Sequence, residues 1–319
     1  MVQPELTLLS FIVINRNTAA LLVKCLDHIF RSDLQQKPAV IVVDNGSSDN
    51  SVALVKDRYP DVTVIEAGRN MGFAAANNMA VQSAKGDFVV LVNTDALLER
   101  SCAQSLLDLM KADPHVGMAG PQLLNADGSP QTSYEAAPTI WTETLNRSLL
   151  KRLFPSRFPG KTRKPSEPEQ VETLIGAVMM IRRQAMEQLG GFDEDYFFFL
   201  EETDLAVRMR QAGWKVIHDP RARAIHLQGA TAKDYHASAR IEFYRSRYLF
   251  FRKHYSVRAM RILKGVIMAN LTLNVFALGL ASLLTLGTAE KITARYRVRA
   301  DLWKWHLRGC PEGFGLPRD

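Results

Sequence analysis

The sequence predicts an α/β protein with a mostly parallel, Rossmann-like sheet flanked by helices, followed by a helical region that associates with a membrane. In the front of the chain, short β-branched runs alternate with segments of helical spacing. This alternation is typical of parallel sheets covered by helices on both faces. The end of the chain is basic and carries a long uncharged stretch. We therefore divide the chain into an α/β domain (1–255) and a helical region (256–319).

The order of elements follows from these runs. Four strands are predicted, at residues 6–14, 39–43, 62–66 and 88–92. Helical spacing marks the segments 18–31, 49–58, 73–84 and 98–111. Ser47 and Ser48 are suitable N-caps for the second helix. Further along, a basic, proline-rich loop (154–168) precedes an apolar run (174–181), and helical periodicity resumes at 205–212.

Composition limits the protein class. With 319 residues, 47% of them hydrophobic and 23% charged, the chain is long enough for one large globular domain, with or without an appendage. Its three cysteines are far apart and match no zinc or redox spacing, which favours a reducing compartment. The apolar run 6–14 has no preceding basic segment, so it is interpreted as a strand rather than a signal peptide.

Charge is concentrated at the end of the chain. Residues 240–319 contain 15 Lys/Arg and 5 Asp/Glu, a local charge of +10 within a total of +7. Such a region favours an anionic lipid surface or nucleic acid as partner. Residues 266–289 carry no charge and are long enough to span a bilayer. The polar residues on one side of that helix fit an interfacial or re-entrant helix at least as well as a complete span. The alternative without a membrane is a pair of helices buried against the α/β domain.

Polar residues follow three of the predicted strands, at Asn15, Asp44 and Asn93-Thr94-Asp95. Ligands of open α/β sheets bind beyond the carboxyl ends of strands. Asp44 could accept the imide N–H of a pyrimidine, although turn chemistry explains most of the segment around it. No G-x-G-x-x-G follows the first strand, so a dinucleotide-binding enzyme is disfavoured, and Gly160-Lys161-Thr162 lacks the context of a P-loop.

A second acidic group, Glu201-Glu202-Thr203-Asp204, directly follows an aromatic run. Partial desolvation there would raise a carboxyl pKa and suit a general base, but acids also favour the start of a helix. Asp95 could hold a divalent cation that bridges two phosphates, since Mg²⁺ and Mn²⁺ prefer oxygen ligands. His226 follows a predicted strand and becomes a metal candidate only if the fold brings it near Asp95.

Taken in order, these segments resemble the family-2 inverting glycosyltransferases of the GT-A fold, over roughly residues 8–255. Within the family the chain looks most like rhamnosyltransferase-like members that build bacterial surface polysaccharides. The motifs that carry the resemblance are Val42-Val43-Asp44-Asn45-Gly46-Ser47-Ser48-Asp49, Asn70-Met71-Gly72-Phe73-Ala74-Ala75-Ala76-Asn77-Asn78, Asn93-Thr94-Asp95, Gly190-Gly191-Phe192-Asp193-Glu194, Phe199-Leu200-Glu201-Glu202-Thr203-Asp204-Leu205, His226 and Tyr244-Arg245-Ser246-Arg247-Tyr248.

The resemblance implies a site. Glu202 falls at the position of the family's general base, with Glu201 and Asp204 beside it. Asp95 and His226 would bind Mg²⁺ or Mn²⁺. The nucleotide-sugar would contact Asn15, Asp44, Asn70, Gly72, Asn77, Asn93 and Asp95. Two departures matter: Asn93 replaces the first aspartate of Asp-x-Asp, as in the rhamnosyltransferase-like branch, and glutamate stands where the base is usually aspartate, which leaves Glu201 and Glu202 both open.

The implied reaction transfers a sugar, with inversion, from a nucleotide donor to a hydroxyl of a glycan or polyprenyl-linked acceptor. The resemblance favours L-rhamnose from dTDP-rhamnose, with UDP-sugars such as galactofuranose or N-acetylhexosamine donors as alternatives. The expected location is the cytoplasmic face of the membrane, on anionic lipid and without nucleic acid. Two other classes remain open: a nucleotidyltransferase, which normally has a glycine-rich basic loop after its first strand, and a non-catalytic protein that binds nucleic acid or membrane through the basic tail.

Overall fold

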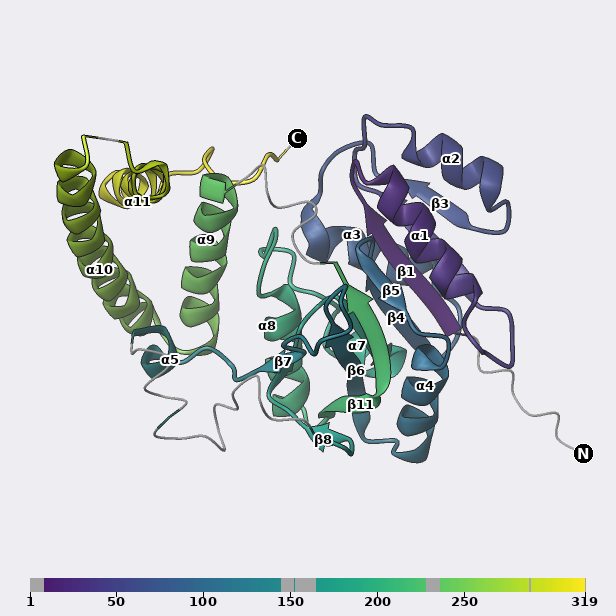
Figure 1. Ribbon diagram of the computed structural model, residues 1–319. Helices are drawn as coiled ribbons and strands as arrows, with labels where there is room; N and C mark the ends of the chain where they lie inside the picture. The colour runs from purple at the N-terminus through teal and green to yellow at the C-terminus, as the bar shows by residue number, and fades with distance from the viewer. Residues whose placement is uncertain (1–8, 145–151, 153–164, 228–235, 287, 319) are drawn as a thin grey trace, which may run out of the picture.

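A computed structural model describes residues 9–144, 152, 165–227, 236–286 and 288–318. It has a central mixed sheet with helices on both faces, and a separate group of long helices beside it (Figure 1). Residues 6–8 of the first predicted strand, and most of the predicted proline-rich loop 154–168, lie outside the described residues. The α/β architecture predicted from the sequence is confirmed.

The sheet has strand order β3-β2-β1-β4-β10-β6-β11-β5, with β8 pairing β11 off this path. Strands β3, β2, β1 and β4 are mutually parallel, β10 runs antiparallel to both its neighbours, and β6 and β11 are parallel to each other. The main strands are β1 (Leu9–Asn15), β2 (Ala39–Asp44), β3 (Thr63–Glu66), β4 (Phe88–Asn93), β6 (Val116–Leu124), β10 (Val178–Arg182) and β11 (Lys215–His226). The short strands are β5 (Ala96–Leu98), β7 (Tyr134–Glu135), β8 (Glu169–Gln170) and β9 (Thr173–Leu174).

Alternate residues of each central strand enter opposite cores, as the two-residue period of a strand requires. On one face Phe11 and Val13 pack with helices α1, α2 and α4. On the other face Ile12 packs with helices α3, α7 and α8. These helices are α1 (Ala19–Phe30), α2 (Ser51–Arg58), α3 (Gly72–Ser83), α4 (Cys102–Ala112), α7 (Arg183–Gln188) and α8 (Glu201–Gln211).

Two local expectations are corrected, and one run is resolved. The segment predicted as one helix from residue 98 begins as strand β5, and its helix α4 starts only at Cys102. The apolar run 174–181, to which the sequence assigned no element, contains parts of β9 and β10 with a turn at Gly176. Helix α2 begins at Ser51, so Ser47 and Ser48 are not its N-caps; the Ser47 hydroxyl instead accepts hydrogen bonds from Asn15 and Asn17.

The remaining helices form what we call the helical unit, α9 (His236–His254), α10 (Val257–Leu284) and α11 (Glu290–Leu307). They share a core that includes Phe250, Leu263, Leu302 and Trp305, and this core also contains Tyr196 of the α/β domain. Helix α5 (Ile140–Thr144) contacts α10. By packing, α9 belongs with α10 and α11, although it precedes the boundary at 255 that the sequence suggested. Among the described residues, α10 is the one helix long and apolar enough to cross a membrane.

Candidate active site

The carboxyl ends of β2, β1 and β4 meet at one edge of the sheet. Asn15 and Asp44 are register partners, and Ile14 is the partner of Asn93, so three predicted site residues lie side by side. Asn15 Nδ2 donates to Asp44 Oδ1 at 3.3 Å, and Asp44 Oδ2 accepts from the Ser47 backbone N–H at 3.0 Å. One Asp44 oxygen therefore stabilises the turn after β2, and the other joins β2 to the end of β1.

A chain of hydroxyl contacts joins β1 to the turn after β4. Thr18 Oγ1 donates to Asn15 Oδ1 at 2.7 Å and lies 3.2 Å from Thr94 Oγ1. Asn15 is fully buried, and Thr94 and Asp95 are 8% exposed. This packing fixes the turn that carries Asp95 against the neighbouring strand.

The fold brings His226 to Asp95. Strands β5 and β11 pair antiparallel with His226 opposite Ala96, and the Leu227 N–H donates to the Asp95 carbonyl at 2.9 Å. As a result, His226 Nε2 lies 3.5 Å from Asp95 Oδ1. From the sequence, His226 was a candidate metal ligand only if the fold placed it near Asp95. Strand β5, which the sequence did not predict, brings the two residues together.

Gln131 fixes the orientation of the His226 ring. Its Oε1 lies 2.8 Å from His226 Nδ1, while its Nε2 donates to the His226 carbonyl at 3.1 Å and to Asn125 Oδ1 at 3.0 Å. Because the amide nitrogen is committed to two acceptors, Oε1 must accept, and Nδ1 carries the proton. The other ring nitrogen, Nε2, thus faces Asp95. A metal-binding histidine is commonly oriented in this way, with one ring nitrogen free to bind and the other held by a hydrogen-bond partner, here Gln131.

The segment Asn70-Met71-Gly72 is held by Asn45, a residue that the sequence analysis did not single out. Asn45 Nδ2 donates to Asn70 Oδ1 and to the Gly72 carbonyl, both at 3.1 Å, and its Oδ1 accepts from the Met71 N–H at 2.7 Å. Gly72 has φ +81°, and a Cβ there would overlap the Phe197 carbonyl oxygen. Only glycine fits this turn. Its absent side chain lets the backbone pack closely against Phe197, which precedes the acidic segment.

The two asparagines of α3 differ in position. Asn77 is 1% exposed, and its Nδ2 donates to the Phe73 carbonyl within the same helix. Asn78 instead donates to the Phe192 carbonyl at 2.9 Å and accepts from the Phe192 N–H at 2.9 Å. Asn78 therefore holds the Gly-Gly-Phe-Asp-Glu segment, a contact between distant parts of the sequence that no local pattern indicates.

The acidic group begins helix α8. Glu201 is 5% exposed, and burial together with the charge of Glu202 raises its pKa well above the usual value. Glu202 is partly buried, and burial raises its pKa to about 7 against the opposing effect of backbone N–H groups at the helix start. Burial thus favours the uncharged form of Glu201, whereas Glu202, with its pKa of about 7, is available in both protonation states near neutral pH.

Residues 176 and 177 connect Glu202 to the end of β4. A Cβ on Gly176 would lie 3.3 Å from Glu202 Cγ, so the backbone passes directly against this side chain. The next carbonyl, that of Ala177, accepts from the Asn93 N–H at 2.9 Å. The two acidic groups, far apart in sequence, therefore border the same short stretch of backbone.

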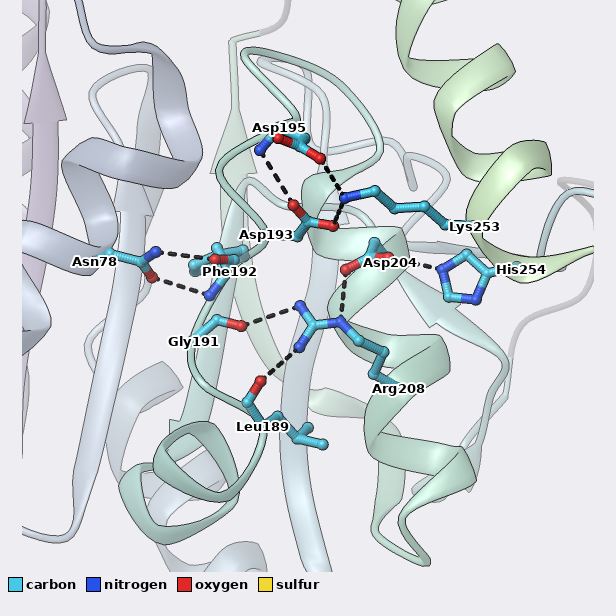
Figure 2. A network of polar contacts seen from close by, with 10 residues as sticks. All are labelled: Asn78, Leu189, Gly191, Phe192, Asp193, Asp195, Asp204, Arg208, Lys253 and His254. Atoms are coloured by element: carbon cyan, nitrogen blue, oxygen red, sulfur yellow. Dashed lines mark hydrogen bonds and ion pairs between the residues drawn. The ribbon is translucent and has the colours of Figure 1, made fainter. Parts of the chain in front are cut away.

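Asp204 lies in a buried ionic network rather than beside Glu202 (Figure 2). Its Oδ2 accepts from Arg208 Nε at 2.7 Å and its Oδ1 lies 2.7 Å from His254 Nε2. Burial alone would raise the pKa of Asp204, but the bonds from His254 and Arg208 hold it below its usual value. Both carboxylate oxygens are occupied, and through them Asp204 joins α8 to α9.

The surroundings of Asp204 extend this network. Arg208 also donates to the carbonyls of Leu189 and Gly191, each at 3.0 Å, and Lys253 forms ion pairs with Asp193 and Asp195 (Figure 2). The Gly-Gly-Phe-Asp-Glu segment is therefore bound from three sides, by α3, α8 and α9.

The approach of His226 to Asp95 at the strand ends is consistent with the resemblance noted in the sequence, and comparison with known sequences decides the family. The profile of "Glycosyl transferase family 2" matches residues 10–190. The chain belongs to this family. A second profile, "N-terminal domain of galactosyltransferase", matches residues 157–229.

Among similar curated proteins of the family are two named rhamnosyltransferases. The chain is 29% identical over 235 residues to the N-acetylglucosaminyl-diphospho-decaprenol L-rhamnosyltransferase of Mycobacterium tuberculosis, covering 68% of this chain and 76% of that protein. It is 25% identical over 215 residues to the O-antigen chain rhamnosyltransferase WbaN of Salmonella anatum, covering 65% of this chain and 62% of that protein.

Solved structures confirm the fold. The mannosyltransferase PcManGT of Pyrobaculum calidifontis, in complex with GDP-Man and Mn²⁺, matches with a TM-score of 0.54 and 18% identity, covering 97% of this chain and 89% of that one. GalNAc-T7 with UDP, GalNAc and Mn²⁺ matches with a TM-score of 0.55 and 17% identity, covering 70% and 44% of the two chains. The family-2 glycosyltransferase is thus a GT-A-type fold followed by an apolar C-terminal helix.

Proposed function

We propose that this glycosyltransferase uses a divalent cation and inverts the sugar it transfers, with Asp95 and His226 at the metal and Glu202 as general base. The 3.5 Å approach of His226 Nε2 to Asp95 Oδ1 carries the proposal. The carboxyl ends of β2, β1 and β4, with Asn15, Asp44, Asn70 and Asn93, would form the nucleotide side of the site. Gly72 and Asn77 would support it from behind.

The donor set fits a divalent cation held jointly with a diphosphate. Two ligands in neighbouring positions of an octahedral ion, each about 2.1 Å away, lie about 3 Å apart, close to the observed separation. Among the described residues no group of three or more His, Cys, Asp or Glu could hold a metal. The remaining ligands would then be phosphate oxygens and water, and the cation would neutralise charge on the departing diphosphate.

Glu202 would take the proton of the acceptor hydroxyl. As that oxygen forms its bond to the anomeric carbon, the bond to the diphosphate oxygen breaks on the opposite face, and the configuration inverts. A carboxyl with its pKa near 7 accepts a proton efficiently at neutral pH. Glu201 next to it is the alternative base, but burial and the charge of Glu202 favour its protonated form.

The first prediction concerns the metal. Imidazole favours transition ions over Mg²⁺, so Mn²⁺ should support activity better than Mg²⁺. His226→Gln should weaken Mn²⁺ binding on the order of 10–100-fold. Losses of this size are found when a residue that only hydrogen-bonds to a metal ligand is removed, so loss of a ligand should cost at least as much. We would titrate MnCl₂ and MgCl₂ in a nucleoside diphosphate release assay, with Asp33→Asn on an exposed ion pair as control. Equal Mn²⁺ dependence in His226→Gln and the native protein would exclude His226 as a ligand.

We propose dTDP-L-rhamnose as the donor and a hydroxyl of a glycan or polyprenyl-linked glycan as the acceptor. The names of the two rhamnosyltransferases similar to this chain support that choice. UDP-sugars, including galactofuranose and N-acetylhexosamine donors, are the alternatives. A donor panel with Mn²⁺, scored by nucleoside diphosphate release and ligand-induced thermal shift, distinguishes them.

We further propose that the enzyme is peripheral at the inner face of the cell membrane and binds anionic lipid through α10 and α11. One side of α10 is buried against the unit, at Leu263, Ile267, Leu271 and Val275. The opposite side exposes an apolar row in helical register, Ile262, Leu273, Phe276, Leu280, Leu283 and Leu284. Helix α11, which packs along α10, exposes Lys291, Arg295, Arg297 and Lys304. An apolar row beside a basic helix fits an anionic interface.

The second prediction tests this surface. Phe276→Asp with Leu280→Asp should abolish co-sedimentation with vesicles of phosphatidylcholine and phosphatidylserine at low salt, because two charges enter the apolar row. Asn274→Asp adds a charge to an exposed position of the same helix outside the row and is the matched control. Undiminished binding of the double variant, or stronger retention on DNA than on vesicles through a salt series, would contradict the proposal.

A further inference from the structure

The turn before the acidic group has an unusual backbone. Phe199 and Leu200 both have left-handed conformations, with φ of 72° and 67°. Such values are uncommon for residues other than glycine, and two in succession persist only where the surroundings impose them. Leu200 immediately precedes helix α8, whose first two residues are Glu201 and Glu202. The conformation of this turn therefore sets the direction in which Glu202 enters the site.

Helix α9 holds two residues of the turn. Ser246 Oγ donates to the Phe198 carbonyl at 2.8 Å, and Ser246 is 2% exposed. The ring of Phe243 packs edge-on against the ring of Phe199, with centroids 5.6 Å apart. Within the α/β domain, the Phe197 carbonyl accepts from the Phe73 N–H at 2.8 Å.

Residues 311–318, which we call the strap, hold the turn from another side. The strap follows α11 and returns across α9 towards α3 (Figure 1). The Arg318 guanidinium lies over the Phe197 ring, 4.5 Å from its centroid, and the Pro317 carbonyl accepts from Asn70 Nδ2 at 2.7 Å. The strap thus touches both the acidic turn and the proposed nucleotide segment.

A buried carboxylate fastens the strap to α9. Glu242 is 1% exposed; its Oε1 lies 2.6 Å from Arg318 Nη2, and its Oε2 lies 3.2 Å from Arg245 Nη1. Arg245 also donates to the Pro311 carbonyl at 2.8 Å. Glu242 therefore joins Arg318 of the strap to Arg245 of α9, and Arg318 contacts both Glu242 and Phe197.

We propose that Arg318 and Ser246 are positioning residues of the transferase reaction: they hold the Phe197–Leu200 turn in the conformation that directs Glu202 to the acceptor. The helical unit is then a part of the catalytic apparatus as well as a membrane-binding element. This inference rests on the proposed role of Glu202. It extends that role by assigning the orientation of the base to residues more than 40 positions away in the sequence.

The test compares turnover with nucleotide binding. Arg318→Ala and Ser246→Ala should each lower kcat by about 10- to 100-fold, the effect of displacing a catalytic group by about 1 Å. Binding of dTDP or UDP with MnCl₂, measured by calorimetry, should change less than about threefold, because neither substitution alters Asp95 or His226 or removes the Pro317 carbonyl that accepts from Asn70. Arg318→Lys, which still pairs with Glu242, should recover most of kcat. Arg308→Ala removes an exposed charge just before the strap and should behave as the native protein.

Two results would overturn the inference: kcat within about twofold of the native value in both alanine variants, or a parallel loss of kcat and nucleotide binding with no rescue by Arg318→Lys. Failure of the proposed function itself has a different signature. In that case Glu202→Gln would turn over normally, or the native protein would show no Mn²⁺-dependent nucleotide binding. Ser246→Ala and Arg318→Ala act on different contacts, so misfolding of one leaves the other as the test.

Discussion

Glu202→Gln is expected to lower kcat by about 10²–10⁴-fold while leaving nucleotide and Mn²⁺ binding intact. The substitution keeps the size of the side chain and removes only its ability to take a proton. Glu202 faces the backbone at Gly176, one residue before the carbonyl that is bonded to Asn93 at the end of β4. Near-native kcat in this variant, with the sugar donor identified by the panel, would refute the base assignment.

Glu201→Gln is the matched control for that experiment. Burial and the neighbouring Glu202 raise the pKa of Glu201 well above the usual value, which favours the uncharged form of this side chain. Glutamine closely mimics the neutral acid, and kcat should stay within a few fold of the native value. If Glu201→Gln loses activity and Glu202→Gln does not, the two roles are exchanged.

The pH dependence of both activity and stability follows from the pKa of Glu202. A base must be deprotonated, so kcat should fall as the pH drops through about 7. The folded-state pKa of Glu202 lies above the ordinary glutamate value of 4.5, so the folded protein binds more protons than the unfolded chain between these two values. Glu202 therefore reduces stability as pH rises through this range, and Glu202→Gln should be at least as heat-stable as the native protein at pH 8.

The sequence predicted the features that depend on local pattern. The strands β1, β2 and β4 were evident from their β-branched runs, and the rule that ligands gather at carboxyl ends placed Asn15, Asp44 and Asn93 together, as the register shows. The family could be inferred because several short motifs occur in order. Each motif alone was explained equally well as a turn or a helix start.

Features that depend on tertiary contacts could not be predicted. Strand β5 has three residues and is stabilised by pairing with β11, more than 120 positions later, so its own composition gives no signal. The partners of Asn45 and Asn78 lie in other segments. The acids of α8 are neighbours in sequence, yet the carboxylate of Asp204 is bound by Arg208 of the same helix and by His254 of α9, and the contact with α9 could not be read from local pattern.

Asp204→Asn should reduce the free energy of unfolding by about 3–5 kcal/mol, the cost of breaking a buried ion pair from one side. Asp204 is 1% exposed, and its loss of charge leaves the buried ends of Arg208 and His254 without their anion. Urea denaturation followed by tryptophan fluorescence measures the change. Since bonds to the anion lower the pKa of Asp204 in the folded state, its contribution is present above the unfolded-state value and is lost as the pH falls below it.

Asp195→Asn provides the comparison for Asp204. Asp195 also pairs with a cation of α9, Lys253, at 2.6 Å, but its side chain is 63% exposed. An exposed pair of this kind contributes about 0–1 kcal/mol, so the two variants separate the effect of burial from that of the pair itself. A comparably small cost for Asp204→Asn would contradict the structural role. If instead Asp204→Asn keeps its stability and loses kcat alone, Asp204 belongs with Glu202 in catalysis and the network of Figure 2 serves proton transfer.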